Sequence, residues 1–175
     1  MVSTIVVESL DLKCEVKRGN WKLTDIIEYC QPKNVNVRSR NKKITSVNGR
    51  TEPTNFTGLF FDQQTVHYLP KGIDKFFPNL KGLAAVSSKL KLLTQDDLKP
   101  LTQFLSVIFS SDDLESLEND LFDFNPKLVY IGFGANKLKY VRENLLSKLR
   151  NLQESYFYDN PCINANATTS PKIPA

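Results

Sequence analysis

The sequence predicts an α/β-type solenoid, with a parallel β-sheet on its concave face and irregular or short helical returns on its convex face. Two observations lead to this expectation. Apolar residues recur at a spacing of 24 residues over most of the chain, and an internal repeat of roughly 20 to 50 residues is typical of repeat folds. The composition is that of an ordinary folded protein, because 41% of the 175 residues are hydrophobic and 24% are charged.

The repeat is clearest in residues 128–149, where apolar residues and one Asn follow the pattern L-x-x-L-x-L-x-x-N-x-L. The same spacing returns in register in earlier units that begin at Phe104, Leu80 and Phe56, and a partial unit begins at Leu152. One such unit cannot bury its own apolar face. We therefore expect the units to stack on a continuous core.

Each unit is expected to contain a strand, a turn and a return segment. The alternation of apolar and other residues at its start predicts a short strand with one face turned inward. Asn136 and Asn160 stand at the ninth residue of their units, where an Asn side chain turns the chain by bonding to nearby backbone groups. Asp112, Ser88 and Gln64 take this place in the earlier units, which predicts a less regular ladder of turns there.

The three cysteines bear on the compartment of the protein. Cys14 and Cys30 each lie in a segment of alternating residues, and two such strands side by side would bring their sulfurs within bonding range. A disulfide between them implies an oxidising compartment, and two buried free thiols are the alternative. Cys162 is a free thiol, forms an intermolecular bridge, or has lost its partner from a truncated C-terminus.

The chain is expected to divide into three parts. Residues 1–50 are predicted to form an N-terminal cap, closed by the disulfide, with a degenerate first unit. Residues 51–162 hold about four full units and a partial terminal unit. Residues 163–175 are rich in Ala, Thr, Ser and Pro and predict a flexible C-terminal tail. Caps are needed because a terminal unit would otherwise expose its apolar face.

Weaker features concern secretion. Residues 1–10 lack the basic start and the long apolar stretch of a signal peptide, so secretion would require that a signal peptide has been removed. Two N-x-[ST] sequons predict glycosylation at Asn55 and Asn166. No apolar run approaches the roughly 20 residues of a membrane-spanning helix, so no membrane span is expected.

Several short segments carry a family resemblance in addition to the repeat. They are residues 44–49, 69–73, 76–80, 120–123 and 160–162. With them, the chain resembles the extracellular leucine-rich repeat proteins with 24-residue repeats, and most of all small secreted insect members with a cysteine-containing N-terminal cap. The resemblance implies a right-handed solenoid, secretion, and non-enzymatic binding through the concave sheet.

The residues that alternate with the inward-pointing ones are expected to face outward on the concave side. Parallel strands lie about 4.8 Å apart, so these residues would form one surface. Exposed apolar residues beside tyrosines are typical of the core of a protein interface, although ordinary sheet composition explains them too. The candidate ligand-binding residues are Phe60, Asp62, Ala84, Val86, Ile108, Ser110, Tyr130, Gly132, Tyr156 and Tyr158. Gly132 and Gly134 would admit a partner's backbone or make room for Tyr130 and Tyr156.

The residue content argues against an enzyme. His67 is the only His, so no Ser–His–acid set can be argued. Residues 132–137 lack the third Gly of a dinucleotide-binding loop. The acidic residues of segment 112–123 do not match the spacing of a calcium loop and are expected on the solvated convex face. We therefore predict no enzymatic activity, no cofactor and no metal site.

Charge is uneven along the chain. The net charge of +4 is too small to indicate nucleic-acid binding by itself, and the basic residues from Arg38 to Lys43 have no aromatic residues among them for base stacking. Nucleic acid is therefore not an expected partner. Residues 1–50 carry an excess of basic side chains, which is either ordinary solvated surface or a feature that steers an acidic partner or a polyanionic glycan.

Two functions are compatible with the sequence. The first is an extracellular binding protein that recognises a protein ligand through the concave sheet, for example in immune recognition or extracellular signalling. The alternative is a structural or matrix protein that self-associates through its C-terminal edge and Cys162.

Overall fold

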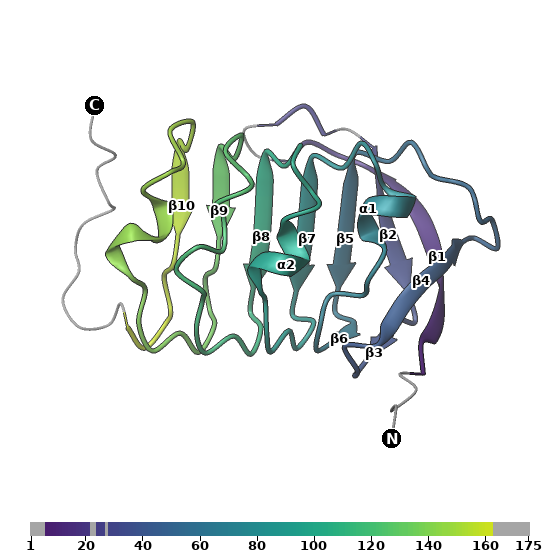
Figure 1. Ribbon diagram of the computed structural model, residues 1–175, viewed down its shortest axis with the longest axis horizontal. Coiled ribbons are helices and arrows are strands. Elements are labelled where there is room, and N and C mark those ends of the chain that lie inside the picture. The colour runs from purple at the N-terminus through teal and green to yellow at the C-terminus, as the bar shows by residue number, and fades with distance from the viewer. Residues whose placement is uncertain (1–5, 22–23, 27, 163–175) are drawn as a thin grey trace, which may run out of the picture.

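The computed structural model describes residues 6–21, 24–26 and 28–162, which form a mostly parallel β-sheet with few short helices (Figure 1). The main sheet has the strand order β10-β9-β8-β7-β5-β2-β1-β4, and β3 pairs with β6 in a separate two-stranded sheet. The strands of the main sheet are β1 (Glu8–Arg18), β2 (Glu28–Lys33), β4 (Lys42–Val47), β5 (Gly58–Asp62), β7 (Gly82–Val86), β8 (Ser106–Ser110), β9 (Tyr130–Gly132) and β10 (Glu154–Tyr156). The other elements are β3 (Asn36–Val37), β6 (Thr65–Val66), α1 (Ile73–Phe76), α2 (Gln95–Leu98) and the 3₁₀ helix η1 (Glu143–Leu146). The expected combination of a parallel sheet with short helical returns is confirmed.

Five successive strands repeat in strict register. Gly58 of β5 pairs with Gly82 of β7, which pairs with Ser106 of β8, and the same step of 24 residues continues through Tyr130 of β9 to Glu154 of β10. The apolar residues of the sequence repeat point to the opposite side from these strands' other residues and are buried. The chain between the strands crosses in front of the sheet in Figure 1, where α1 and α2 lie.

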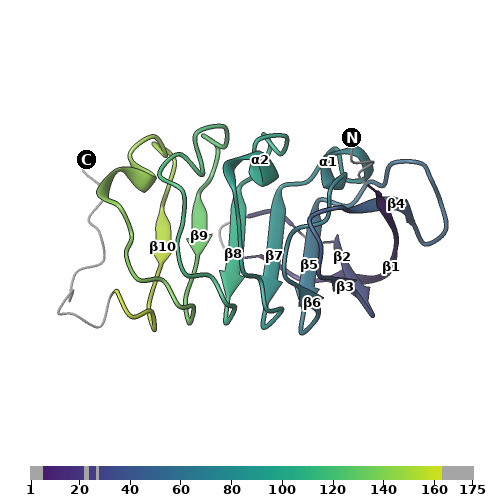
Figure 2. The ribbon, with the colours of Figure 1, turned by 60° about the horizontal axis from the view of Figure 1, so that its bottom comes forward.

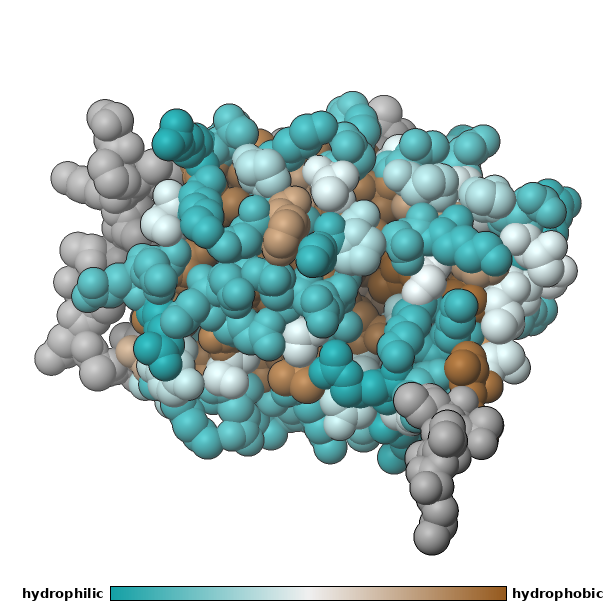
Figure 3. All heavy atoms as spheres, in the orientation of Figure 1, coloured by the Kyte–Doolittle hydropathy of each residue, from teal (hydrophilic) through white to brown (hydrophobic). Residues whose placement is uncertain are grey.

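The core lies between the sheet and these return segments. Large aromatic side chains fill it, each less than 2% exposed: Phe61, Phe76, Phe77, Phe104, Phe109 and Phe133. The ring centroids of Phe109 and Phe133 are 5.6 Å apart, and Phe133 stacks on Phe157 at 5.7 Å. Full burial of such a side chain contributes roughly 2 kcal/mol or more. The surface of the return segments is mainly hydrophilic, as Figure 3 shows for the same view.

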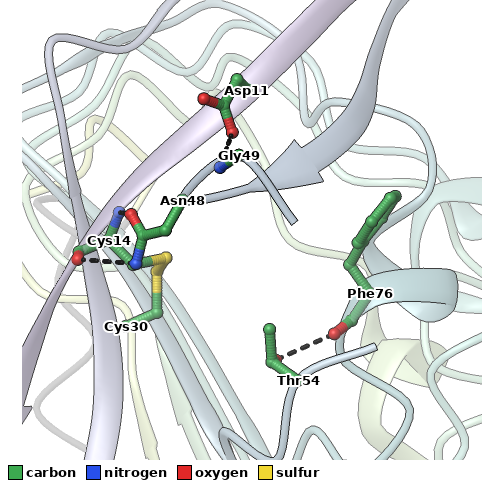
Figure 4. Close-up of a disulfide and its surroundings, with 7 residues drawn as sticks. All are labelled: Asp11, Cys14, Cys30, Asn48, Gly49, Thr54 and Phe76. Carbon is green, nitrogen blue, oxygen red and sulfur yellow. Dashed lines mark hydrogen bonds between the residues drawn. A yellow bond between two sulfur atoms is a disulfide. The ribbon is translucent and has the colours of Figure 1, made fainter. Parts of the chain in front are cut away.

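The N-terminal strands close the end of the sheet beside β5. β1 pairs antiparallel with β2 and parallel with β4, and in Figure 2 these strands curve across that end of the molecule. The predicted disulfide is confirmed, because Cys14 and Cys30 are bonded with their Cα atoms 5.1 Å apart. In Figure 4, the amide of Asn48 accepts from the Cys14 N–H at 2.9 Å and donates to the Cys14 carbonyl at 3.3 Å. This side chain therefore supplies backbone-like pairing beside the disulfide.

The same end is tied to the first helical return. Both the backbone N–H and the hydroxyl of Thr54 donate to the carbonyl of Phe76, at 2.8 and 2.9 Å (Figure 4). The carboxylate of Asp11 accepts from the N–H of Gly49 at 3.0 Å and from the hydroxyl of Ser46 at 2.8 Å. The pKa of Asp11 falls to about 2, first because of its hydrogen bond with Lys13 and then because of these two donors.

A ladder of polar side chains follows the strands. The amide nitrogen of Asn160 donates to the carbonyls of Phe133 and Phe157, at 2.8 and 2.9 Å, while its oxygen accepts from the Leu138 N–H. In the earlier units Ser88 bridges in the same way, since its hydroxyl donates to the Phe61 carbonyl at 3.1 Å. The ladder is less regular in the earlier units, as predicted: Asp112 Oδ2 has no hydrogen-bond partner among the described residues, and the Gln64 amide donates to the Asp62 carbonyl within its own turn. β5, β7 and β8 are nevertheless longer strands than β9 and β10.

The residue before each ladder position adopts a left-handed conformation, with φ between 51° and 56°. These residues are Gln63, Ser87, Ser111, Ala135 and Asp159. None is Gly, although this region favours Gly. The recurrent ladder bonds must therefore hold the turn in this shape.

None of the helices in the described part of the chain has the length and apolar character needed to cross a membrane. The predicted flexible tail, residues 163–175, and the sequon at Asn166 lie outside the described residues.

Candidate functional site

The ten candidate ligand-binding residues all lie on the face of the sheet opposite the core, which we call the outer face. The strand register places them in rows: Phe60, Ala84, Ile108 and Gly132 stand side by side across β5, β7, β8 and β9. A second row contains Asp62, Val86 and Ser110, and Tyr156 pairs with Gly132 from β10. The structure therefore brings these residues together as expected. Some of these residues are nevertheless buried by another part of the chain.

A segment of the chain's own N-terminal region covers one half of the outer face. Trp21 and Ile26, from the connection between β1 and β2, form a cluster with Ala84, and Phe60 and Ile108 pack against it. Ala84 is only 2% exposed and Ile26 is fully buried. The Trp21 ring meets the Phe60 ring edge-on at 6.2 Å. The expectation that Ala84 contacts a ligand is therefore corrected, because the chain itself occupies this position, whereas Phe60 remains half-buried beside the cluster.

Two glycines make the covering possible. A Cβ atom at Gly82 would lie 2.4 Å from Cδ1 of Ile26 and 2.6 Å from two ring carbons of Trp21. A Cβ at Gly58 would lie 2.7 Å from Cβ of Tyr29. Any side chain at these positions would push the connection off the sheet. Gly58 and Gly82, which pair with each other across β5 and β7, therefore leave the space that Trp21 and Ile26 occupy.

The covering connection is also fixed by polar contacts. The N–H and the hydroxyl of Thr24 both donate to the Trp21 carbonyl, at 3.0 and 2.9 Å. The ammonium of Lys81, next to β7, pairs with the carboxylate of Asp25 at 2.9 Å. Because of this ammonium, the pKa of Asp25 lies below its usual range. The sequence did not predict that Trp21 and Ile26 cover the sheet. The available signal was a single Trp in an otherwise polar stretch.

The other half of the outer face carries three tyrosines, which we call the tyrosine end: Tyr130, Tyr156 and Tyr158. The centroids of Tyr130 and Tyr156 are 5.6 Å apart, and Tyr156 meets Tyr158 edge-on at 6.4 Å. The hydroxyl of Tyr156 donates to the carboxylate of Glu154 at 2.8 Å. Tyr158 is 56% exposed. This end therefore presents a connected aromatic surface with a carboxylate beside it.

The two glycines of β9 and its following turn differ in importance. A Cβ at Gly134 would come within 2.7 Å of the Tyr158 ring, whereas a Cβ at Gly132 would meet its nearest neighbours at ordinary distances of 3.5 Å or more. Gly134 is therefore what allows the Tyr158 ring to approach the backbone this closely. The sequence had left two roles open for these glycines, access for a partner's backbone or space for Tyr130 and Tyr156, and Tyr158 was not among the residues expected there.

The acidic segment 112–123 does not lie wholly on a solvated surface. Asp112 is only 6% exposed and belongs to the ladder of turns, where its Oδ1 accepts from the N–H of Ser88 at 2.7 Å and of Leu90 at 3.2 Å. Burial raises the pKa of Asp112 to about 6. Asp113 and Glu115 are instead paired with Lys137 and Lys139, each at 2.6 Å.

No metal-binding group of three or more His, Cys, Asp or Glu residues exists among the residues that the structure describes. Asn55 is exposed and lines a hollow of about 410 Å³ together with Asp25, Glu28, Phe56 and Thr57. Cys162 is half-buried, and burial raises the pKa of its thiol. This disfavours the thiolate form that a bridge to a second copy would need.

The sequence matches no protein-family model and no curated protein.

Proposed function

We propose that this protein is a secreted, non-enzymatic binding protein of the leucine-rich repeat type, a solenoid that recognises a protein ligand with the tyrosine end of its outer face. The solenoid and the family are supported by the strict step of 24 residues from β5 to β10 and by the ladder of Asn136 and Asn160. Secretion is supported by the disulfide between Cys14 and Cys30, since disulfides persist in oxidising compartments. The exposed sequon at Asn55 would then be available for glycosylation.

The observation that carries the binding proposal is the exposed Tyr158 ring seated over Gly134 in contact with Tyr156. Tyrosines lose little conformational freedom on binding and are enriched among the residues that dominate interface energies. A ring already held against the backbone by its neighbours loses even less. The carboxylate of Glu154 accepts the Tyr156 hydroxyl and so helps to hold that ring in place.

The half of the outer face under Trp21 and Ile26 contributes in a different way. Trp21, Ile26 and Ala84 are buried there, so a ligand would contact the tyrosine end and stop at the covered half. Ile108, which packs against the covering cluster, marks the boundary. The proposed ligand therefore has a footprint over β8, β9 and β10 only, which is small and favours a short peptide segment or loop of a protein.

The proposal is tested by comparing Tyr158→Ala with Tyr140→Ala. Tyr140 is also an exposed tyrosine, at 49%, but it lies in the return segment after β9, where it contacts Arg142. Wild-type and variant proteins are immobilised and exposed to extracellular fluid of the source organism, and bound proteins are quantified by mass spectrometry. A protein retained by the wild type and by Tyr140→Ala, and lost with Tyr158→Ala, is then purified for titration.

In that titration we expect Tyr158→Ala to weaken binding by about 30-fold, the effect of removing one dominant interface tyrosine. Tyr140→Ala should leave the affinity within about twofold of the wild type. Recovery of the same partners in the same amounts by both variants would exclude the tyrosine end as the binding site.

A further inference from the structure

The turns that follow the strands carry charged side chains along one edge of the molecule. The N–H of His67 donates to the carbonyl of Val37 at 2.8 Å, and the N–H of Lys91 donates to the carbonyl of His67 at 3.1 Å. Val37 pairs with Val66. Arg38, His67 and Lys91 therefore occupy equivalent places in three adjacent turns of the chain. This edge begins at β3 and β6, at the lower right of the molecule in Figure 1.

In the second half of this edge opposite charges alternate and neutralise each other. In the later units Asp113 pairs with Lys137 and Glu115 pairs with Lys139, both at 2.6 Å. The Lys139 N–H donates to the Glu115 carbonyl at 3.1 Å. Glu115 and Lys139 therefore occupy, in the next two turns, the place that His67 and Lys91 occupy in the earlier ones. The second half of the edge therefore has little net charge.

The first half of the edge has no such compensation. Lys89 and Lys91 are exposed, and neither ammonium has an acidic group within 4.0 Å among the residues that the structure describes. The guanidinium of Arg38 is also exposed and bonds to the amide oxygen of Asn36 at 3.0 Å. We call Arg38, His67, Lys89 and Lys91 the basic cluster.

The positive charges of this cluster affect the pKa of the His67 imidazole. Its burial, and then the positive charges of Lys91, Arg38 and Lys89, hold the pKa of His67 below its ordinary value, while Asp113 acts in the opposite direction. The imidazole is therefore neutral at pH 7. A polyanion placed on the cluster would reverse this effect, because negative charge near an imidazole favours its protonated form.

We propose that the basic cluster binds a sulfated polysaccharide. Arg38 and Lys91 lie in the first and third of three adjacent turns, which are about 4.8 Å apart, and Lys89 lies beside Lys91 in the third. Cations spaced along a line in this way match a chain of anionic groups rather than a single small anion. The cluster contains no Phe, Tyr or Trp, so it lacks the large stacking surface typical of single-stranded nucleic-acid sites. The disulfide favours an oxidising compartment, where sulfated polysaccharides occur. This site lies on the turn edge and is separate from the tyrosine end.

The test compares two double variants of the full chain, Lys89→Gln with Lys91→Gln and Lys137→Gln with Lys139→Gln. Each variant removes two exposed lysines, and the two pairs occupy equivalent places in different turns. Both variants therefore change the net charge equally. The probe is a heparin oligosaccharide of about ten sugars, titrated at low salt. We expect the first variant to bind roughly 25-fold more weakly, since one charge contact in water corresponds to about fivefold, and the second variant to change by about twofold or less.

Nuclear magnetic resonance of the single histidine gives an independent readout. We expect the pKa of His67 to rise when the oligosaccharide binds to the wild-type protein. Equal losses in both double variants, or an unchanged pKa of His67 in the complex, would overturn the proposal. Binding of a single-stranded oligothymidine of equal charge as tightly as heparin would overturn it in favour of nucleic acid.

Discussion

Asp112 occupies a place in the ladder of turns that asparagine fills in the later units. The amide nitrogen of Asn136 donates to the carbonyls of Phe109 and Phe133, at 2.7 and 3.1 Å. At Asp112 the corresponding group is an oxygen, and Oδ2 has no hydrogen-bond partner among the described residues. An ionised carboxylate would place negative charge where the ladder needs a donor. Protonation supplies that donor, in keeping with the pKa of about 6.

We therefore expect Asp112→Asn to stabilise the protein, and more so at pH 7.5 than at pH 4.5. The pKa of Asp112 is higher in the folded than in the unfolded chain, so its stabilising contribution is present below about pH 4 and is lost as the pH rises through 6. The difference between the two pH values should be about 2 kcal/mol in the free energy of urea-induced unfolding. Asp113→Asn, at an exposed ion pair, is the control. An equal gain from Asp112→Asn at both pH values would contradict this interpretation.

At this scale the sequence predicted which residues face the core and which face outward, because a period of two along strands and of 24 along the chain determines both. It did not predict the left-handed residues before each ladder position. Gln63, Ser87 and Ala135 share no chemical signal for this conformation. The turn arises from bonds made by the following residue to the neighbouring unit, and those bonds exist only after the units have stacked.

The connection between β1 and β2 is the element whose position decides how much of the outer face is open. It carries Trp21 and Ile26 onto β5 and β7 and is held there by shape at Gly82 and by the ion pair of Lys81 with Asp25. Periodicity could not predict this contact, because the connection has no repeat and its partners on β5 and β7 lie tens of residues further along the chain. The strands beneath it were predicted correctly from the same sequence.

Replacing Gly82 with Val should displace this connection from the sheet. The new Cβ would overlap with Ile26 and Trp21, so Trp21, now 8% exposed, should move into water. Trp21 is the only tryptophan, and its fluorescence emission should therefore shift to longer wavelength. Gly132→Ala, where the nearest atoms are 3.5 Å away or more, should leave the emission unchanged. The same emission maximum in both variants would show that the connection tolerates the added side chain.

The molecule as a whole is closed at its N-terminal end by β1, β2 and β4 and their disulfide. The bond links residues separated by 16 positions, and the loop that it closes includes the covering connection. Loss of the disulfide would increase the conformational entropy of the unfolded chain. It would also weaken the packing of the N-terminal strands against the core.

Replacement of Cys14 and Cys30 by Ser should lower the free energy of unfolding by roughly 3 kcal/mol, the effect expected for a loop of this length. Urea denaturation followed by circular dichroism measures it. Cys162→Ser, at a half-buried free thiol, should cost less than about 1 kcal/mol. If all three serine replacements together cost no more than Cys162→Ser alone, the disulfide does not stabilise this end.

The constant register from β5 to β10 has a consequence for the evolution of the chain. Each of these strands pairs only with its immediate neighbours, and residues 24 positions apart occupy equivalent places in the sheet. Excision of residues 83–106 would join Gly82 to Val107 and restore the same sequence of pairings with one strand fewer. The length of such a gene product can thus grow or shrink in whole steps by duplication or loss of a single segment, and its reach along a partner can change without redesign of either end.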